Sequence, residues 1–466
     1  MRPIALFLCL LQGAPADEYK TKLAQLSKNT AAKHYAVGDY LSTAQMHLWA
    51  RAEFNKTLEF DPDHENARKR LGYKKGENGW ENDPSLKQEF ANKKKAEDAE
   101  RVRKAYLERL ETAGRDLSRQ WTDLGLFCKK NSLAKEAQDA FRKALEYDPS
   151  NSAVRKELGY EKDAKGVWIS KVERELRKEM KDGIAKAPEG TTSGVSTQSE
   201  EKLSLKNTKR ESGHFLLESP HLKDRELADL VQHAEHAYAM FHKIFGETDL
   251  YGGRKHNYLV LKDKVQHERF VDTFHGGSAA QKDLAKKSAG TGKFPFSEMY
   301  QDTRPMPSIQ DMVVHVVAES LCEILIGSRE HHWLNEGVAY HFTRLMKDSA
   351  STYCVDLAGS GPKSDGKNYQ DSANWPIVCK VWVREGKDPN IDEILKCTNI
   401  AELSGAETVK AWSLVDFLMA EHRDKLIQLC KTLKEEKPID EALKAVWNWT
   451  PADFDFRWKQ FVRVSY

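Results

Sequence analysis

Apolar side chains recur at helical spacing through much of the second half of the chain. Residues 308–327 keep one apolar face, which Met312, Val317 and Leu321 mark, and Gly327 supplies a helix stop. Shorter runs of alternating or continuous apolar residues predict strands. The pattern predicts strands at 213–218, 257–261 and 294–300, and helices at 225–245, 308–327, 333–346, 407–419, 425–435 and 439–447. We expect an α+β domain with a helical C-terminal portion, in which 294–300 is the edge strand of the sheet.

The first half of the chain contains an internal repeat. Residues 34–73 align with residues 121–160 at a constant offset of 87 and without a gap. The aligned pairs are Gly38 and Gly125, Ala50 and Ala137, Phe54 and Phe141, Leu58 and Leu145, Asp61-Pro62 and Asp148-Pro149, and Leu71-Gly-Tyr73 and Leu158-Gly-Tyr160. We expect the small residues to let two antiparallel helices approach closely, with the Phe filling the space between them.

Within each copy the order of small and large residues resembles a tetratricopeptide repeat (TPR), with Ala137-x3-Phe141 followed by Pro149 in the second copy. Both copies run on to a Gly and a Trp, at Gly79-Trp80 and Gly166-Val-Trp168, which predicts a short turn or hairpin after the helix pair. The charged stretch 86–115 between the copies predicts a solvated helix rather than an interaction arm. Such repeats bind a segment of another protein or brace a neighbouring domain.

Composition along the chain sets the expected domain boundaries. Residues 1–16 have the layout of a signal peptide, with Arg2, an apolar run at 4–11 and the small residues Ala14-Pro-Ala16. Residues 185–200 contain one Val and no other large apolar side chain, which predicts a flexible linker. We therefore expect a TPR-like helical domain at 17–182, a linker at 183–204 and an α+β domain at 205–466, in a protein that is secreted or periplasmic.

Charge and cysteine content narrow the functional classes. The 73 basic and 71 acidic residues give a net charge of +2, which provides no argument for a nucleic acid or an anionic membrane as partner. After position 16, no stretch has the eighteen or so apolar residues of a membrane span. Export would permit disulfides among Cys354, Cys379 and Cys397, whereas Cys128 and Cys322 are expected as buried free thiols. Pairing and oligomeric state stay open.

Candidate chemistry is concentrated in two consecutive predicted helices. His315 and Glu319 stand four positions apart, so their side chains share one helix face. Glu336 lies near the start of the next helix, within Trp333-Leu-Asn-Glu-Gly-Val-Ala339. One imidazole and two carboxylates can ligate a divalent metal. The simpler alternative is that His315 and Glu319 form only a polar pair on a helix surface.

These residues resemble the gluzincin metallopeptidases, in which an HExxH helix is followed, after about eighteen residues, by a Glu in a WLxEGxA signature. The signature is matched in full at 333–339, and the intervening segment of 16 residues is slightly shorter. The resemblance implies a zincin-like fold over 205–466, with His315, Glu319 and Glu336 in the positions of the zinc ligands. It also places Val316 in the position of the general base, and Glu319 in that of the second His.

Val316 determines the function that we expect. Its side chain cannot accept a proton, and loss of a positioned general base removes a factor of about 10² to 10⁴ in rate. The resemblance then implies no catalytic residue at this position and impaired hydrolysis. In the family a Tyr from outside the motif often assists the reaction; Tyr353 and Tyr369 are the nearest candidates, with ordinary packing as the alternative.

We therefore expect a secreted, peptidase-like pseudoenzyme that binds a peptide or protein partner, with zinc or with no cofactor. One alternative is an active zinc metallopeptidase with an altered site of one His and two Glu. The other is a TPR-type scaffold for protein interactions.

Overall fold

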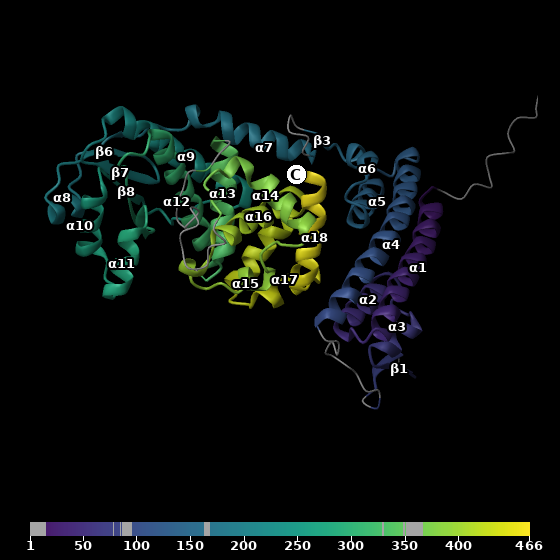
Figure 1. The fold of residues 1–466 in the computed structure, drawn as a ribbon. Helices are drawn as coiled ribbons and strands as arrows, with labels where there is room; N and C mark the ends of the chain where they lie inside the picture. The colour runs from purple at the N-terminus through teal and green to yellow at the C-terminus, as the bar shows by residue number, and fades with distance from the viewer. Residues whose placement is uncertain are drawn as a thin grey trace, which may run out of the picture. The chain divides into compact units, whose positions relative to one another are not determined.

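The computed structural model describes residues 15–77, 79–83, 85, 96–162, 168–328, 330–347, 350 and 367–466. The chain divides into two compact units, Met1–Glu161 and Lys162–Tyr466 (Figure 1). It is mostly helical, with a mixed six-stranded sheet in the second unit, so the expected α+β class is confirmed at this level. Most of the predicted signal peptide, the 86–95 part of the charged stretch, Tyr353 and Cys354 lie outside the described residues.

The first unit consists of two copies of one order of elements. Its elements are α1 (Pro15–Thr43), α2 (His47–Phe60), α3 (Glu65–Arg70), β1 (Tyr73–Gly76), β2 (Gly79–Asn82), α4 (Ala96–Lys130), α5 (Ala134–Tyr147) and α6 (Ser152–Glu157), and β3 (Glu161–Lys162) follows at the boundary. The bounds of α2 and α3 recur in α5 and α6 at the offset of 87 residues found in the sequence. The hairpin predicted for the first copy is formed by β1 and β2, which pair antiparallel from Tyr73 with Asn82 to Gly76 with Gly79.

Glycine and phenylalanine fix how closely the two helices of each copy approach. A Cβ atom at Gly38 of α1 would lie 2.7 Å from the Phe54 ring of α2, and one at Gly125 of α4 would lie 2.5 Å from the Phe141 ring of α5. Both rings are almost completely buried. The predicted Gly–Phe contact is therefore present in each copy.

A buried carboxylate ties three helices of the first unit together. Glu53 of α2 has no solvent exposure and accepts hydrogen bonds from His34 of α1 at 2.7 Å, Lys56 at 2.9 Å and Tyr106 of α4 at 3.0 Å. Burial alone would raise the pKa of Glu53, but Lys56 and His34 hold the pKa well below its usual range. The carboxylate is therefore charged, and each charge in the cluster has a partner.

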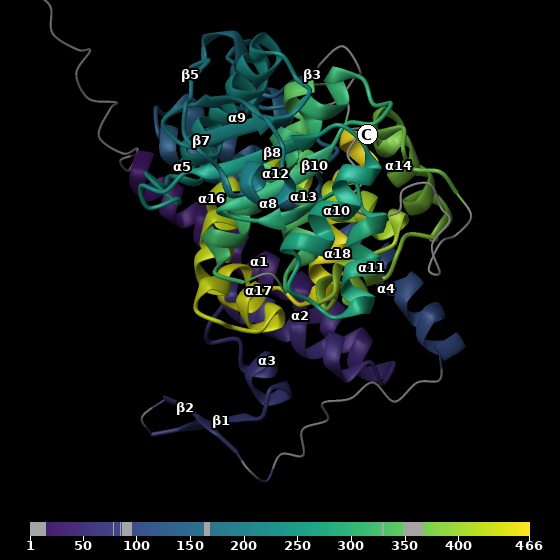
Figure 2. The ribbon, with the colours of Figure 1, turned by 90° about the vertical axis from the view of Figure 1, so that its left-hand side faces the viewer.

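The second unit is built on a mixed sheet of strand order β5-β6-β7-β8-β10-β9 (Figure 2). Its elements up to the sheet's last strand are β4 (Trp168–Ile169), α7 (Lys171–Asp182), η1 (Ile184–Lys186), β5 (Thr191–Thr192), α8 (Gln198–Leu203), β6 (Thr208–Glu211), β7 (Phe215–Ser219), α9 (Asp224–Phe245), β8 (His256–Leu261), α10 (Lys264–Phe274), α11 (Ala279–Lys287), β9 (Gly290–Lys293) and β10 (Phe296–Tyr300). The three central strands β7, β8 and β10 are parallel to one another. The pairs β5–β6, β6–β7 and β10–β9 are antiparallel. Buried residues on both faces of β8 fit this central, parallel position.

Two sequence predictions in this region differ from the structure. The strand predicted as the edge, now β10, lies between β8 and β9, and β9 forms the edge instead. The segment 183–204, expected to be a linker, contains η1, strand β5 of the sheet and helix α8, which a Thr197–Glu200 capping box begins. The boundary between the compact units accordingly lies near residue 161, before α7, rather than near residue 183.

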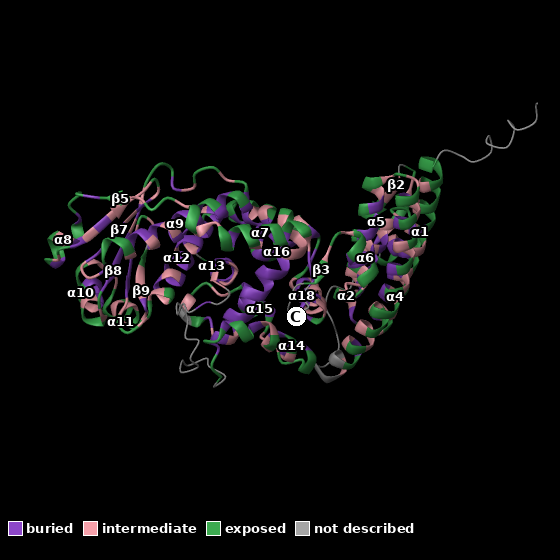
Figure 3. Cartoon of the chain, turned by 90° about the horizontal axis from the view of Figure 1, so that it is seen from above, coloured by how far each residue is buried: buried purple, intermediate pink, exposed green. Residues whose placement is uncertain are grey.

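Helices cover both faces of the sheet. Phe215, Tyr258 and Met299 point from one face into the main core, which α9 and the following helices complete, whereas Leu259 and Leu261 point to the opposite face with α8 and α10. The elements after the sheet are α12 (Met306–Ile326), α13 (His332–Lys347), η2 (Ser372–Asn374), α14 (Trp375–Glu385), α15 (Ile391–Leu395), η3 (Ile400–Glu402), α16 (Gly405–Lys434), α17 (Ile439–Trp447) and α18 (Pro451–Ser465). The first half of α16 is buried on nearly all sides and forms the centre of this helical portion (Figure 3).

Replacing Glu53 with Gln should destabilise the first unit by about 3 kcal/mol at pH 7, because the basic side chains around the buried carboxylate lose their negatively charged partner. Since the pKa of Glu53 is depressed in the folded state, its contribution is present above the unfolded-state pKa of about 4.3 and is lost as pH falls below it. Hydrogen exchange of the α1 and α2 amides in increasing urea, at pH 7 and at about pH 2.5, well below the unfolded-state pKa, measures both effects.

Glu65→Gln is the matched control, because Glu65 forms an exposed ion pair with Lys69 and its replacement should leave stability nearly unchanged. Equal exchange rates in Glu53→Gln and Glu65→Gln at pH 7 would contradict the assigned role of Glu53.

Candidate metal-binding site

Helix α12 carries two of the three candidate ligands. It begins at Met306, after Pro305 and without a side-chain cap, two residues before the start at 308 predicted from the sequence. It ends at Gly327, whose φ of 69° is the left-handed conformation that favours glycine, as predicted. His315 is completely buried in this helix, and Glu319, one turn further on, is partly exposed.

Helix α13 supplies the third candidate ligand and packs tightly between its neighbours. Glu336 is completely buried near the start of this helix. A Cβ atom at the next residue, Gly337, would lie 2.6 Å from the Val415 side chain and 2.7 Å from the Ala411 carbonyl oxygen of α16. The glycine of the signature therefore lets α13 lie directly against α16, and this close contact sets the position of Glu336.

The three predicted ligands come together in space. His315, Glu319 and Glu336 each offer one ligand atom, and these atoms all lie within 4.8 Å of one another. No other such group of three or more His, Cys, Asp or Glu side chains occurs in the part of the chain that the structure describes. His315 Nε2 lies 3.5 Å from Glu336 Oε2, which is too long for a strong hydrogen bond.

The polar atoms around Glu336 fit a bound cation. Both carboxylate oxygens of Glu336 are buried and have no hydrogen-bond donor among the described residues, and neither polar atom of the neighbouring Asn335 side chain has a hydrogen-bond partner among them. Burial lowers the pKa of His315, but Glu336, Glu319 and Asp311 raise it more, so the net shift is upward. An imidazole beside a buried carboxylate whose two oxygens have no donor among the described residues is an electrostatic environment that suits a divalent cation.

The residues next to the ligands show what the site lacks. Val316 is partly buried and packs against the apolar core, so the position expected for a general base holds no proton acceptor. The Tyr340 ring lies across the His315 ring, with centroids 4.7 Å apart and planes at 73°. Tyr340 was not among the sequence candidates, although its position four residues after Glu336 puts it on the same face of α13.

The other sequence candidates lie outside this group. The Tyr369 ring is buried against Trp382 and its carbonyl accepts a hydrogen bond from Trp375, which is the packing role given as the alternative. His332 bonds to the Thr398 carbonyl, and neither it nor His331 belongs to the group of ligands. The described cysteines 128, 322, 379 and 430 are free thiols, and Cys128 and Cys322 are buried as expected.

Asp416, a buried acidic residue that the sequence analysis did not single out, contacts α13 through His341. Asp416 of α16 lies 3.3 Å from His341 Nδ1 and 3.5 Å from Arg177 of α7, and accepts a hydrogen bond from the Tyr466 hydroxyl at 2.9 Å. Burial would raise the pKa of Asp416, but His341, Arg177 and Tyr466 lower it to about 2. Asp416 is therefore ionised and holds α7, α13 and α16 together.

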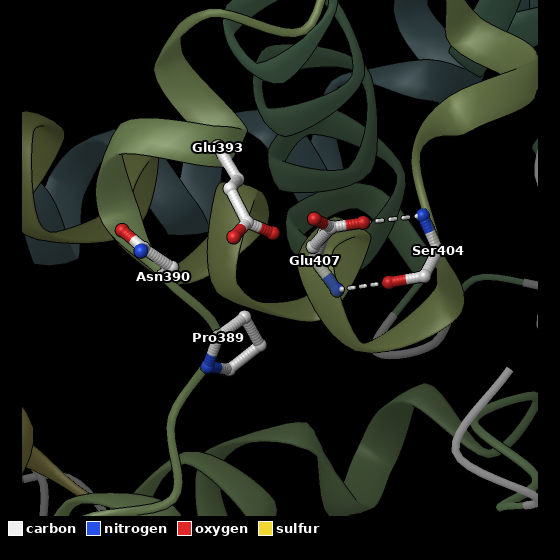
Figure 4. A pocket seen from close by; sticks show the side chains of 5 residues that line it. All are labelled: Pro389, Asn390, Glu393, Ser404 and Glu407. Atoms are coloured by element: carbon white, nitrogen blue, oxygen red, sulfur yellow. Dashed lines mark hydrogen bonds between the residues drawn. The ribbon is translucent and has the colours of Figure 1, made fainter. Parts of the chain in front are cut away.

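A pocket elsewhere in the second unit does not supply an alternative reaction centre. It lies between α15 and the start of α16 and is lined by Pro389, Asn390, Glu393, Ser404 and Glu407 (Figure 4). Glu407 accepts a hydrogen bond from the Ser404 amide and its own amide donates to the Ser404 hydroxyl, so both residues serve as the cap of α16. Glu393 is exposed, and no histidine or cysteine lines the pocket.

Comparison with protein-family models gives no match for this chain, and comparison with curated proteins gives none either. Among the described helices, none has both the length and the apolar character needed to cross a membrane. The candidate site is therefore supported by its own geometry.

Gly337→Ala should destabilise the second unit by about 1 to 3 kcal/mol, because the added methyl group has no space against α16. Thermal unfolding measures the change. Gly276→Ala is the control, since a Cβ atom at Gly276 would meet nothing within 4 Å. Equal melting temperatures for the two variants would show that α13 and α16 are not in close contact.

Proposed function

We propose that the second unit is a gluzincin-like domain that holds a divalent metal ion at His315, Glu319 and Glu336 but lacks normal peptidase activity, and that it binds a peptide or protein partner. The observation that carries the proposal is the convergence of these three side chains within 4.8 Å. The match of 333–339 to the family signature supports the same assignment. The layout of residues 1–16 supports export of the protein.

The ligand set favours binding over hydrolysis. His315 would provide a nitrogen ligand, and Glu319 and Glu336 would provide oxygens, so that two carboxylates neutralise a divalent ion. When bound, zinc in such a site acts as a Lewis acid toward water and carbonyl groups. Two negative ligands weaken that effect, and Val316 cannot take the proton that hydrolysis requires. Both changes reduce peptide cleavage without removing the site.

A free sheet edge supports a peptide as the partner. Among the described strands, β9 pairs only with β10, so the other side of β9 is available to an extended segment. Gly290 and Gly292 leave no side chain at two of its four positions. The helix pairs of the first unit provide a second surface of the kind that binds peptide segments in helical repeats.

The purified full-length protein, incubated with Zn²⁺ and passed through a desalting column, should retain one zinc ion per chain. Glu336→Gln should lose the ion, because it removes a charged ligand, whereas Glu323→Gln, one turn beyond Glu319 on α12, should retain it. Elemental analysis by mass spectrometry gives the stoichiometry. Zinc that is absent from the wild type, or retained equally by Glu336→Gln, would remove the metal site from the proposal.

Hydrolysis of casein tests the proposed loss of activity. The zinc-loaded wild type should show no chelator-sensitive cleavage, and Val316→Glu combined with Glu319→His should raise the rate by a factor of about 10² or more if the remaining architecture is competent. Glu319→His alone is the control, since it restores a ligand without a base. Cleavage by the wild type that His315→Ala abolishes would instead establish the alternative, an active metallopeptidase with an altered site.

A further inference from the structure

Four polar side chains form a closed hydrogen-bonded ring on the face of the sheet opposite the main core. Glu218 Oε2 of β7 accepts a hydrogen bond from the Thr197 hydroxyl at 2.5 Å and another from Asn207 Nδ2 at 2.8 Å. Asn207 Nδ2 also lies 3.2 Å from the Ser199 hydroxyl, which lies 2.8 Å from the Thr197 hydroxyl. The ring connects the start of α8 and the residue before β6 to the centre of β7.

Every proton in this ring is already used. The single hydroxyl proton of Thr197 points to Glu218, so Ser199 must donate to Thr197. The two amide protons of Asn207 point to Glu218 Oε2 and to Ser199. No donor is left for Glu218 Oε1 or for Asn207 Oδ1, and both atoms are buried without a hydrogen-bond partner. Glu218 Oε1 and Asn207 Oδ1 are therefore buried acceptors without a donor among the described residues.

The charge of Glu218 has no counterpart in the ring. Glu218 has no solvent exposure, and among the described residues no Lys, Arg or His forms an ion pair with it. Lys209 of β6, which stands opposite Glu218 in the strand pair, bonds at 2.6 Å to Glu200 instead. The Glu200 carboxylate also accepts from the backbone amides of Thr197 and Asn207. An ionised Glu218 would be buried with neutral donors on one oxygen only, which is costly unless a cation is present.

We propose that a monovalent cation of the sodium type binds beside this ring, held by Glu218 Oε1 and Asn207 Oδ1. The ligand set consists of oxygen atoms, which hard cations prefer, and it supplies one uncompensated negative charge, which a single positive charge balances. The bound ion fixes residues 197–207 to β7. It thereby orders a segment whose composition is that of a flexible linker.

The melting temperature of the full-length protein in different chloride salts at equal ionic strength tests this proposal. Changing 100 mM choline chloride to 100 mM NaCl should raise the melting temperature by about 3 °C, because only the folded state binds the ion. Glu218→Gln removes the charge, so it should abolish the difference between the two salts. Glu201→Gln removes an exposed carboxylate of α8 and should keep the full difference in melting temperature between the two salts.

Crystals transferred into RbCl provide an independent measurement, whether or not Glu218→Gln folds. An anomalous peak beside Glu218 Oε1 and Asn207 Oδ1 would support the site. Equal melting temperatures in the sodium and choline salts, with no peak beside Glu218, would overturn the proposal and leave an ordered water molecule as the occupant. The zinc content is measured on the same samples, so failure of the sodium site and failure of the metal site at His315 are distinguishable.

Discussion

The direct contact of α13 with α16 is the constraint on which the candidate site depends. Gly337 has no side chain, and the space that one would occupy is filled by Val415 and by backbone of Ala411. A helix held this closely on one side has little freedom on the other, where Glu336 meets His315 of α12. The Asp416 cluster holds the same helix through His341. The positions of the ligands are thus fixed by the packing of helices and not by a flexible loop.

Three buried glutamates show how differently the chain accommodates a carboxylate. Glu53 accepts bonds from three donors, two of them on basic side chains, and its pKa is lowered. Glu298 of β10 has His267 as partner, yet burial prevails and raises its pKa to about 7. Glu336 has His315 near it but no hydrogen-bond donor on either oxygen. Glu53 and Glu298 find hydrogen-bond partners among the side chains of the chain, whereas Glu336 has none among the described residues, and this difference makes Glu336 a candidate ligand.

Local patterns in the sequence predicted the helices and strands well, but they predicted poorly which elements lie next to one another in space. The helix pairs, the Gly327 stop and the face shared by His315 and Glu319 follow from spacing alone, because they depend on residues within a few turns. The edge strand was misassigned because β9, with the sequence Gly-Thr-Gly-Lys, has no apolar alternation to mark it. The 183–204 segment has the composition of a linker because its hydroxyl groups can bond to solvent as well as to protein. The partner of the Thr197 hydroxyl, Glu218, lies on β7 and gives no signal within the segment. The link between His341 and Asp416, 75 positions apart, has no local signal either.

Separate consequences follow from the two changes within the motif. A divalent ion at His315, Glu319 and Glu336 would join α12 to α13, and the free energy of its binding would stabilise the folded state, whatever the chemistry at the site. In the proposed site, a valine at position 316 in place of a base would affect only proton transfer, and the apolar side chain of Val316 contributes to the core that supports α12. The second carboxylate, at Glu319, keeps a ligand but adds negative charge. Metal binding and hydrolysis are therefore physically separable in the proposed site, which can hold a metal without a base for hydrolysis.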